Sequence, residues 1–393
     1  MKLDEIQKAL REQRIDAWLF YDHHHRDPIG ERILGLDREA LVSRRWYYVV
    51  PADGEPRKLV HRIESGRLDA VPGRAAVYSS WQELEAGLRA MLVPFQRIAM
   101  QYSPRNAIMY VSMVDAGTVE LLREMGKQVV SSADLVSRFE AILSEEQIAS
   151  HYAAQRAIDG ILEEGFREIG RRTRPAAAGA TTLTEYDMVL WFQEAMGRAG
   201  LVWEHPTNVS VNQNSADSHY EATAGGSKPI RDGDFLLIDI WGREDRPGTC
   251  FYDITWTGVI GRAPSDREQQ VFQTVAKARD AAVSLVESAF TTGVEIAGWQ
   301  ADDAARSVIR DAGFGEYFTH RTGHNIASEI HGNGAHLDNL ETHDERLLLP
   351  FTCFSVEPGI YLPEFGIRSE VNMMTSANGA VVTGRVQHEL LRI

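Results

Sequence analysis

The sequence has little cysteine: Cys250 and Cys353 are the two cysteines among its 393 residues. Two thiols cannot form the disulfide framework of a secreted domain, so we expect both to be reduced and the protein to be cytoplasmic. The sequence also lacks any apolar run near the ~20 residues that a membrane span needs. Its charged start, Met1–Glu5, lacks the apolar core and cleavage site of a signal peptide. We therefore expect no membrane partner.

Positive charge is also scarce. The chain has 41 Lys and Arg against 56 Asp and Glu, which gives a formal net charge of −15. Nucleic acids bind basic surfaces, so the sequence predicts no nucleic-acid partner. Hydrophobic residues make up 44% of the chain and charged residues 25%, which excludes a disordered protein. Part of the acidic excess is available to bind metal ions.

The length predicts two or three domains at about 150 residues each. Strand and helix patterns alternate over residues 1–135, with a hairpin signal at Asp53-Gly54. A long helical pattern then runs over about 133–172, and a Pro/Ala/Gly segment at 174–179 breaks it. We expect an α/β domain at 1–135 and a second domain at 136–393.

The pattern of predicted secondary structure changes along the second domain. Strand-like runs and Gly/Pro turns dominate from 200 to 261 and again from 351 to 386. Two amphipathic helices are predicted between them, at 266–288 and 293–312. Helices and strands in separate blocks indicate an α+β fold.

The first domain carries no catalytic constellation, and its one unusual feature is the run His23-His24-His25. Three consecutive side chains cannot converge on one ion, so we expect a solvated loop after a strand. The alternative is a loop that reaches the active site of a neighbouring subunit.

Four carboxylates interrupt apolar strand patterns, although ionised acids are poor strand formers and are rarely buried without a partner. They are Asp239, Asp253, Glu357 and Glu370. Desolvating an isolated carboxylate costs several kcal/mol, and Arg368 is one of few basic residues nearby. Each pair flanks a Gly/Pro-rich loop, which predicts two hairpins whose carboxylates face one space. Two divalent cations there would balance the charge; edge-strand acids that face water are the alternative.

The second informative group is histidine. His320, His324 and His331 fall within twelve residues, and Gly323 allows the backbone a close approach or a sharp bend. Their spacing also fits one face of a helix. His219 lies in a polar, loop-like stretch, where an exposed histidine is the alternative. The motif His-Glu-x-x-His is absent, which argues against a single-zinc protease, and spacing alone does not say which histidine binds metal.

Together these segments resemble the pita-bread metallopeptidases, the family of methionine aminopeptidase, aminopeptidase P and prolidase. The resemblance spans about 140–390 and rests on Ile238-Asp239, Tyr252-Asp253-Ile-Thr, Gly323-His324, Val356-Glu357-Pro-Gly-Ile-Tyr361 and Gly366-Ile-Arg368-Ser-Glu370. It implies an α/β N-terminal domain followed by an α+β pita-bread catalytic domain. It also implies two divalent metal ions per chain (Mn, Co or Zn), with Asp239, Asp253, His324, Glu357 and Glu370 as ligands.

Within the family, the position of His320, the position of Arg368 and the preceding α/β domain resemble the proline-specific branch. The branch implies hydrolysis of the Xaa-Pro imido bond in dipeptides by a metal-bridging hydroxide, with an Xaa-Pro aminopeptidase of longer peptides as the alternative. It implies His219, His331 and Glu357 as catalytic residues, and His320 and Arg368 as substrate-binding residues. A salt bridge from Arg368 to the ligands is its alternative role. The resemblance also implies a homodimer.

Two other interpretations stay open: a non-catalytic binding protein on the same fold, and another hydrolase activity such as phosphotriester cleavage. The sequence also departs from the family. Trp256 stands where an arginine is frequent, Asn325 replaces a common glycine, and Gly332 follows His331 in place of an acid. These departures bear on the shape of the pocket and on substrate length.

Overall fold

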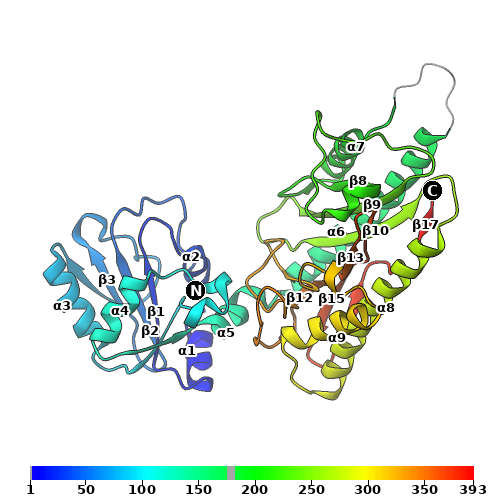
Figure 1. Cartoon of the computed structure of the whole chain (residues 1–393). Helices are drawn as coiled ribbons and strands as arrows, with labels where there is room; N and C mark the ends of the chain where they lie inside the picture. The colour runs from blue at the N-terminus through cyan, green and yellow to red at the C-terminus, as the bar shows by residue number, and fades with distance from the viewer. Residues whose placement is uncertain (1, 175–181) are drawn as a thin grey trace. The chain divides into compact units, whose positions relative to one another are not determined.

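The computed structural model describes residues 2–174 and 182–393. The chain divides into two compact units, Met1–Glu140 and Ala141–Ile393 (Figure 1). Of the predicted break at 174–179, all but Arg174 lies outside the described residues. Among the described helices, none has the length and hydropathy that crossing a membrane requires.

The first unit is built on a six-stranded sheet in the order β4-β3-β2-β1-β5-β6. β1 is antiparallel to β2 and parallel to β5, so the sheet is mixed. The predicted hairpin at Asp53-Gly54 is confirmed, because it connects the antiparallel strands β2 and β3. The strands are β1 Ala17–Asp22, β2 Trp46–Pro51, β3 Arg57–His61, β4 Arg74–Tyr78, β5 Arg97–Met100 and β6 Gln128–Ser131. The helices are α1 Leu3–Glu12, α2 Pro28–Leu34, α3 Trp81–Leu92, α4 Ala116–Glu124 and α5 Ala133–Val136.

The second unit places long helices around three sheets. Its helices are α6 Glu145–Thr173, α7 Glu185–Arg198, α8 Asp266–Thr292 and α9 Gly298–Asp311. One sheet has β17-β10-β9-β7 with β8 paired to β9, another has β11-β12-β15-β16, and β13 pairs with β14. The strands are β7 Leu201–Val202, β8 Asn208–Val211, β9 Phe235–Glu244, β10 Tyr252–Val259, β11 Asn325–Ile326, β12 Cys353–Val356, β13 Gly359–Tyr361, β14 Gly366–Arg368, β15 Val371–Ser376, β16 Gly379–Thr383 and β17 Leu391–Arg392.

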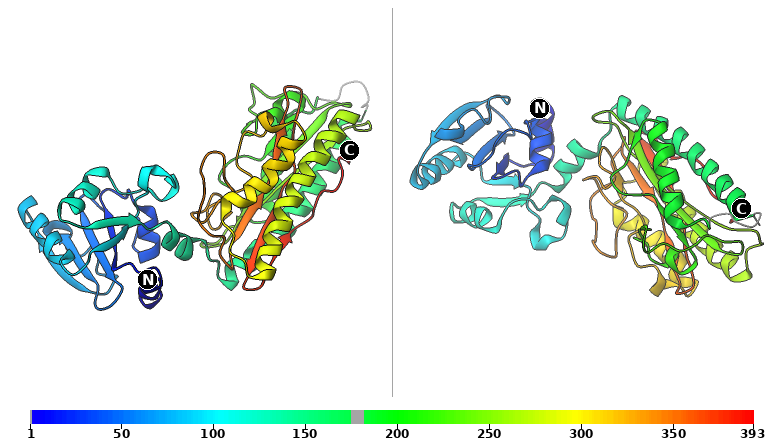
Figure 2. Two further views of the ribbon diagram at one scale, coloured as in Figure 1. Left: turned by 60° about the horizontal axis from the view of Figure 1, so that its bottom comes forward. Right: turned by 90° about the horizontal axis from the view of Figure 1, so that it is seen from above.

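Each large sheet of the second unit has its own pair of helices. α6 and α7 share one apolar core with β8, β9 and β10. α8 and α9 lie side by side (Figure 2) and share a second core with the strands that include β12 and β15. The two sheets meet where the Asp253 amide donates to Asn372 Oδ1 over 3.0 Å. The helices therefore leave the space between the sheets to side chains from β10 and β15.

The predicted long helix at 133–172 is partly wrong. α5 ends at Val136, a short π-helix follows at Ser137–Ala141, and α6 begins only at Glu145. Ser144 starts α6 with a capping box to Gln147, which satisfies its free amides. The helix predicted at 293–312 begins later, at Gly298, because Gly293 ends α8 in a left-handed conformation.

Candidate metal centre

Two of the predicted ligands lie on neighbouring strands of one sheet. β9 and β10 are antiparallel, with Asp239 opposite Thr255. Asp253 lies opposite Trp241, two residues beyond Asp239 on β9. Opposite residues share a face, and so do alternate residues of one strand. Both carboxylates therefore point to the same side, and the predicted hairpin is confirmed.

Glu357 and Glu370 lie where two strands of the second sheet end. β12 and β15 pair as far as Val356 and Val371, and each acid is the next residue beyond that pair. The hairpin of β13 and β14 fills the sequence between them. The Glu370 amide lies 3.3 Å from the carbonyl of Thr255, which places Glu370 beside β10.

The histidine segment is not a helix, so the helix-face interpretation is wrong. Its backbone is held in short strand-like pairs: Gly323 bridges to Leu337, and β11 pairs with β12. A Cβ on Gly323 would lie 1.9 Å from the carbonyl oxygen of Ser355. Gly323 therefore allows the backbone before His324 to lie against β12, the close approach that its small size predicts.

His324 connects the two carboxylate pairs. Its Nε2 lies 3.5 Å from Asp253 Oδ2 and 3.3 Å from Glu357 Oε1. Asp253, His324 and Glu370 each offer one ligand atom, and these atoms all lie within 4.8 Å of one another. The structure thus brings the five predicted ligands together from two sheets and one loop.

The buried carboxylates have too few hydrogen-bond donors. Thr255 Oγ1 lies 2.9 Å from Asp239 Oδ1 and 2.7 Å from Glu370 Oε2, yet it carries one proton. Asp253 Oδ1 and Glu370 Oε1 are buried and have no hydrogen-bond partner among the described residues. Leaving such oxygens unpaired is costly. A divalent cation would satisfy them, and oxygen ligands with one imidazole suit Mn, Co or Zn.

The pKa values of the cluster point the same way. Burial raises the pKa of Asp239 to about 7 and also raises the pKa of Asp253. Burial and the neighbouring carboxylates raise the pKa of Glu370 well above its ordinary value. Burial acts upward on Glu357 too, but the positive charges of His324 and Arg368 leave its pKa lowered. The folded site therefore disfavours the ionised forms of Asp239, Asp253 and Glu370, and bound cations would favour them.

Arg368 lies buried among these acids. Its Nη2 contacts Asp239 Oδ2, and its Nε donates to Thr255 Oγ1 over 2.9 Å. Its Nη1 lies 3.3 Å from the hydroxyl of Tyr361. Arg368 therefore takes part in the salt bridge to the ligands that was its alternative role, while its contact with substrate stays a prediction.

The three other predicted histidines lie around the cluster. His320 bonds to Tyr361 and to the carbonyl of Arg321, and burial lowers its pKa to about 4. The His331 ring lies 4.3 Å from the His324 ring, whose charge, together with burial, lowers the pKa of His331 to about 3. His219 is exposed but close enough to add to that effect.

Sequence reasoning missed the residues that hold the ligands in place. Thr255 and Tyr361 were part of the family segments but were assigned no task. Asp302 on α9 accepts hydrogen bonds from the amide and the hydroxyl of Thr322, at 2.9 and 2.6 Å, and so fixes the chain two residues before His324. No local pattern marks an acid on one helix as the partner of a loop twenty residues away.

The run His23-His24-His25 follows β1, as predicted. The His25 ring lies 2.7 Å from Glu31 Oε1 and 3.0 Å from the carbonyl of Ala40. Asp22, His25 and Glu31 are close enough to hold an ion, but Arg67 already pairs with Glu31 at 2.6 Å. We therefore assign no metal to this group, and a contact with a neighbouring subunit stays a prediction.

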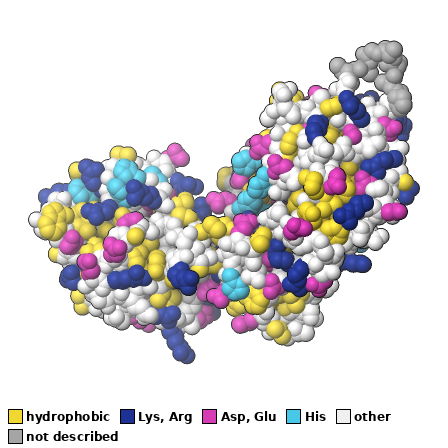
Figure 3. Space-filling view, viewed as in Figure 1, with side chains coloured by type: hydrophobic (Ala, Val, Ile, Leu, Met, Phe, Trp, Pro, Cys, Tyr) yellow, Lys and Arg dark blue, Asp and Glu magenta, His cyan; other side chains and the backbone are white. Residues whose placement is uncertain are grey.

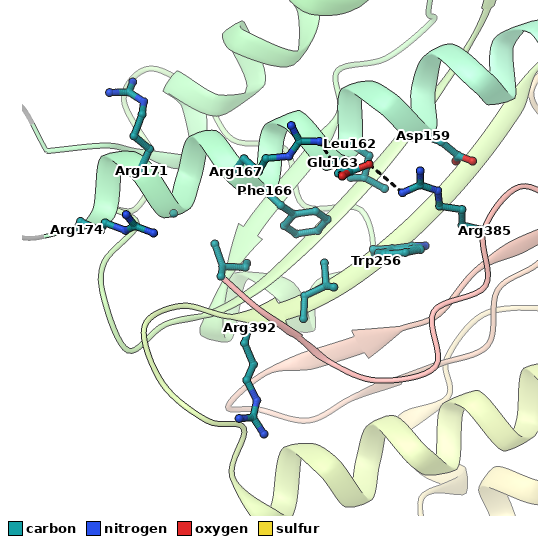
Figure 4. Close-up of a pocket in the computed structure, with 13 residues that line it drawn as sticks. Asp159, Leu162, Glu163, Phe166, Arg167, Arg171, Arg174, Trp256, Arg385 and Arg392 are labelled. Carbon is teal, nitrogen blue, oxygen red and sulfur yellow. Dashed lines mark hydrogen bonds and ion pairs between the residues drawn. The ribbon is translucent and has the colours of Figure 1, made fainter.

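A cavity of about 550 Å³ lies elsewhere in the second unit, between α6 and β17 (Figure 4). Phe166, Trp256 and Leu391 line it, and Glu163 at its rim pairs with Arg385. Trp256 follows Thr255 on β10, so it faces the opposite side of the sheet from the carboxylates. The candidate chemistry therefore does not lie in this cavity.

Acidic and basic side chains are interspersed over the visible face of each unit (Figure 3). This pattern accompanies the net charge of −15.

Comparison with known proteins identifies the family. Residues 151–377 match the model of metallopeptidase family M24. A protein of Mycobacterium tuberculosis named "Probable dipeptidase PepE" is 28% identical over 364 residues, 90% of this chain and 87% of that protein. The Xaa-Pro dipeptidase of Pyrococcus furiosus is 28% identical over 261 residues, 66% of this chain and 67% of its own.

Solved structures share the fold. Dipeptidase PepE of Mycobacterium ulcerans has a TM-score of 0.71 at 23% identity, covering 100% of this chain and 96% of its own. The prolidase of Pyrococcus horikoshii has a TM-score of 0.64 at 22% identity, covering 99% of each chain. They confirm the predicted fold class, an α/β N-terminal part followed by an α+β pita-bread part. With its buried acid and histidine cluster and a family match over most of the second unit, the chain belongs to metallopeptidase family M24.

Proposed function

We propose that this chain is an Xaa-Pro dipeptidase that works with two divalent cations. The observation that carries the proposal is the set of four carboxylates beside His324, of which Asp253 and Glu370 are buried and each have one oxygen without a partner among the described residues. Membership of a metallopeptidase family supports the same conclusion. The relatives named Xaa-Pro dipeptidase support the choice of substrate.

The residues that would hold the cations are Asp239, Asp253, His324, Glu357 and Glu370. Bound cations there would act as Lewis acids and would lower the pKa of water toward ~7, which supplies hydroxide at neutral pH. The donor set favours Mn, Co or Zn. No thiolate is present to select zinc alone, because both cysteines are buried in a separate apolar cluster.

Glu357 is our candidate for proton transfer. An Xaa-Pro bond has no N–H, so the leaving prolyl nitrogen must be protonated as the tetrahedral intermediate collapses. The lowered pKa of Glu357 keeps it ionised and able to accept a proton at neutral pH, and Ser355 Oγ orients its Oε1 over 3.0 Å. His331 and exposed His219 would donate hydrogen bonds to the substrate carbonyl as negative charge develops there.

Arg368 would bind the carboxylate that follows proline, and His320 would act in substrate binding by holding Tyr361 beside it. Tyr361 joins the two, at 2.7 Å from His320 and 3.3 Å from Arg368. A guanidinium suits a carboxylate because it can present two parallel donors. Arg368 would then serve both Asp239 and the substrate.

The deciding experiment compares an Xaa-Pro dipeptide with an Xaa-Pro-Yaa-Yaa peptide as substrates of the metal-loaded protein. A dipeptidase cleaves the first and leaves the second nearly intact. Preference for the longer peptide would favour the alternative, an Xaa-Pro aminopeptidase. Turnover that survives complete chelation would contradict a metal-dependent reaction.

We further propose that the protein is a cytoplasmic homodimer. Two buried free cysteines suit a reducing compartment. Sedimentation of the purified chain tests the oligomeric state.

A further inference from the structure

Asn208 is a polar side chain buried beside the candidate metal centre, and its carboxamide oxygen has no hydrogen-bond partner among the described residues. It begins β8 and lies directly opposite Asp239 of β9. Cross-strand partners share a face, so Asn208 lies on the side of the sheet that carries the carboxylates. It is 5% exposed, and its Oδ1 has no partner among the described residues.

An unpaired buried amide needs an explanation. A buried donor or acceptor without a partner costs about 1–3 kcal/mol, and a leucine of similar size would avoid that cost. Asn208 would recover it if a bound molecule supplied the missing hydrogen bond.

Trp241 adds a second unpaired polar atom to the same face. It lies two residues beyond Asp239, so it is the diagonal neighbour of Asn208, about 7–8 Å away between backbones. Its Nε1 is buried and also lacks a partner among the described residues. An unpaired acceptor on Asn208 and an unpaired donor on Trp241 thus belong to two neighbouring residues on the face of the sheet that carries Asp239.

The two flanks of Asp239 differ. β10 lies on one side, where Thr255 and Arg368 contact the carboxylate. β8 lies on the other side, with Asn208. With Arg368 holding the carboxylate that follows proline on the β10 side, the side chain of Xaa would lie on the other flank of Asp239, toward β8.

We propose that Asn208 determines the Xaa specificity and selects an uncharged, hydrogen-bonding side chain, best a carboxamide. The carboxamide NH₂ donates to Asn208 Oδ1, and its oxygen accepts from Trp241 Nε1. A site built to hydrogen-bond a ligand discriminates strongly against an isostere without those groups. This inference rests on the proposed function for the direction in which the substrate lies.

The test uses near-isosteric dipeptides with the manganese-loaded full chain. The kcat/KM is measured for Asn-Pro against Leu-Pro, and for Asn-Ala against Leu-Ala. We expect the unaltered chain to prefer Asn over Leu by about tenfold or more within a series. Asn208→Leu should reverse the preference, by losing Asn-Pro and gaining Leu-Pro.

Thr207→Val is the matched control. Thr207 is the residue just before β8, it is buried, and its Oγ1 also lacks a partner among the described residues, but it has no place opposite Asp239 in the sheet. The control should keep the Asn-to-Leu ratio of the unaltered chain. An equal ratio in Asn208→Leu, or a native preference for Leu, would overturn the inference.

The two series separate this inference from the proposed function. Cleavage of the alanine series alone would refute proline specificity, while the Asn-to-Leu ratio would still judge Asn208. If neither series is cleaved, calorimetric binding of Asn-Pro and Leu-Pro to the manganese-loaded protein gives the same ratio. Equal affinities in the unaltered chain would then reject the role of Asn208.

Discussion

The phenolic oxygen of Tyr361 lies 2.7 Å from Nε2 of His320, and this contact, together with one at the other ring nitrogen, shows which nitrogen of the histidine carries the proton. The other ring nitrogen, Nδ1, lies 2.7 Å from the carbonyl of Arg321, which can only accept. Nδ1 therefore carries the proton, and Nε2 accepts from Tyr361. Because Arg368 donates to the same hydroxyl, a directed chain runs from the carboxylate cluster to the loop before His324.

Replacing Tyr361 by Phe tests this chain. The change leaves Nε2 of His320 without a donor, and we expect it to lower stability by about 1 kcal/mol. We also expect kcat/KM on an Xaa-Pro dipeptide to fall about tenfold, because His320 and Arg368 lose their common partner. Kinetics and thermal unfolding measure both effects. Tyr317→Phe, a change at a half-buried tyrosine three residues before His320, should alter neither.

The carboxylates of the cluster should lower the stability of the metal-free protein, and the same carboxylates should bind the metal. Because Glu370 is buried with an unpaired oxygen among other acids, Glu370→Gln should stabilise the metal-free protein, by about 1 kcal/mol. The variant should lose activity and bind less metal. The unaltered chain should gain about 2.7 kcal/mol when the metal is a hundredfold above its Kd.

Chemical unfolding with EDTA and with manganese measures these differences, and elemental analysis gives the metal content. Asp159→Asn is the control, since Asp159 is a buried acid bonded to Tyr252 on the opposite face of the sheet. A Glu370→Gln protein that keeps full metal and turnover would disprove the ligand assignment. Alanine at Asp253 should likewise abolish activity and lower bound metal.

Arg368→Ala separates the two tasks of this arginine. If Arg368 binds the substrate carboxylate, losing that contact should lower kcat/KM on an Xaa-Pro dipeptide by the equivalent of about 2–5 kcal/mol. If Arg368 contacts substrate, KM rises while metal content holds. If it only neutralises Asp239, metal content changes and KM on the remaining active protein does not. Arg385→Ala, at an exposed ion pair with Glu163, is the control.

Much of the centre could be predicted from the sequence because its carboxylates interrupt recognisable apolar strand patterns. Asp239 and Asp253 stand out as acids in apolar runs, and strand alternation alone puts them on one face. Gly323 likewise signals a close backbone approach, which the structure has against Ser355.

The supporting contacts could not be predicted, because each joins residues that are distant in sequence. His320 finds Tyr361 forty-one residues later, and Asp302 reaches Thr322 from a helix. The helical spacing of the histidines misled for the same reason: their segment pairs with Leu337 and β12, and those pairings outweigh any local preference. Asn208 has no sequence signal until its opposite residue is known.

His151 should make the second unit sensitive to acid. Its Nδ1 donates to the carbonyl of Phe251 over 2.6 Å, its Nε2 accepts from Thr383, and burial lowers its pKa from 6.5 to about 4. Between pH 6.5 and 4, His151 is therefore protonated in the unfolded chain and neutral in the folded chain. Stability from this group is complete above pH 6.5 and declines by about 1.4 kcal/mol per pH unit below it, until the pH falls through 4.

His151→Asn removes the titrating ring and keeps a donor for Phe251. Urea unfolding in EDTA from pH 7 to 4 measures the free energy of unfolding of both proteins. The free energy of unfolding of the unaltered chain, minus that of His151→Asn, should fall by about 3 kcal/mol from pH 7 to 4. Only the unaltered chain has a histidine at this position that takes up a proton on unfolding. His343→Asn, the same substitution at an exposed histidine, is the control for the change of side chain itself. Parallel pH profiles for the unaltered chain and His151→Asn would show that the folded chain accepts the proton as readily as the unfolded one.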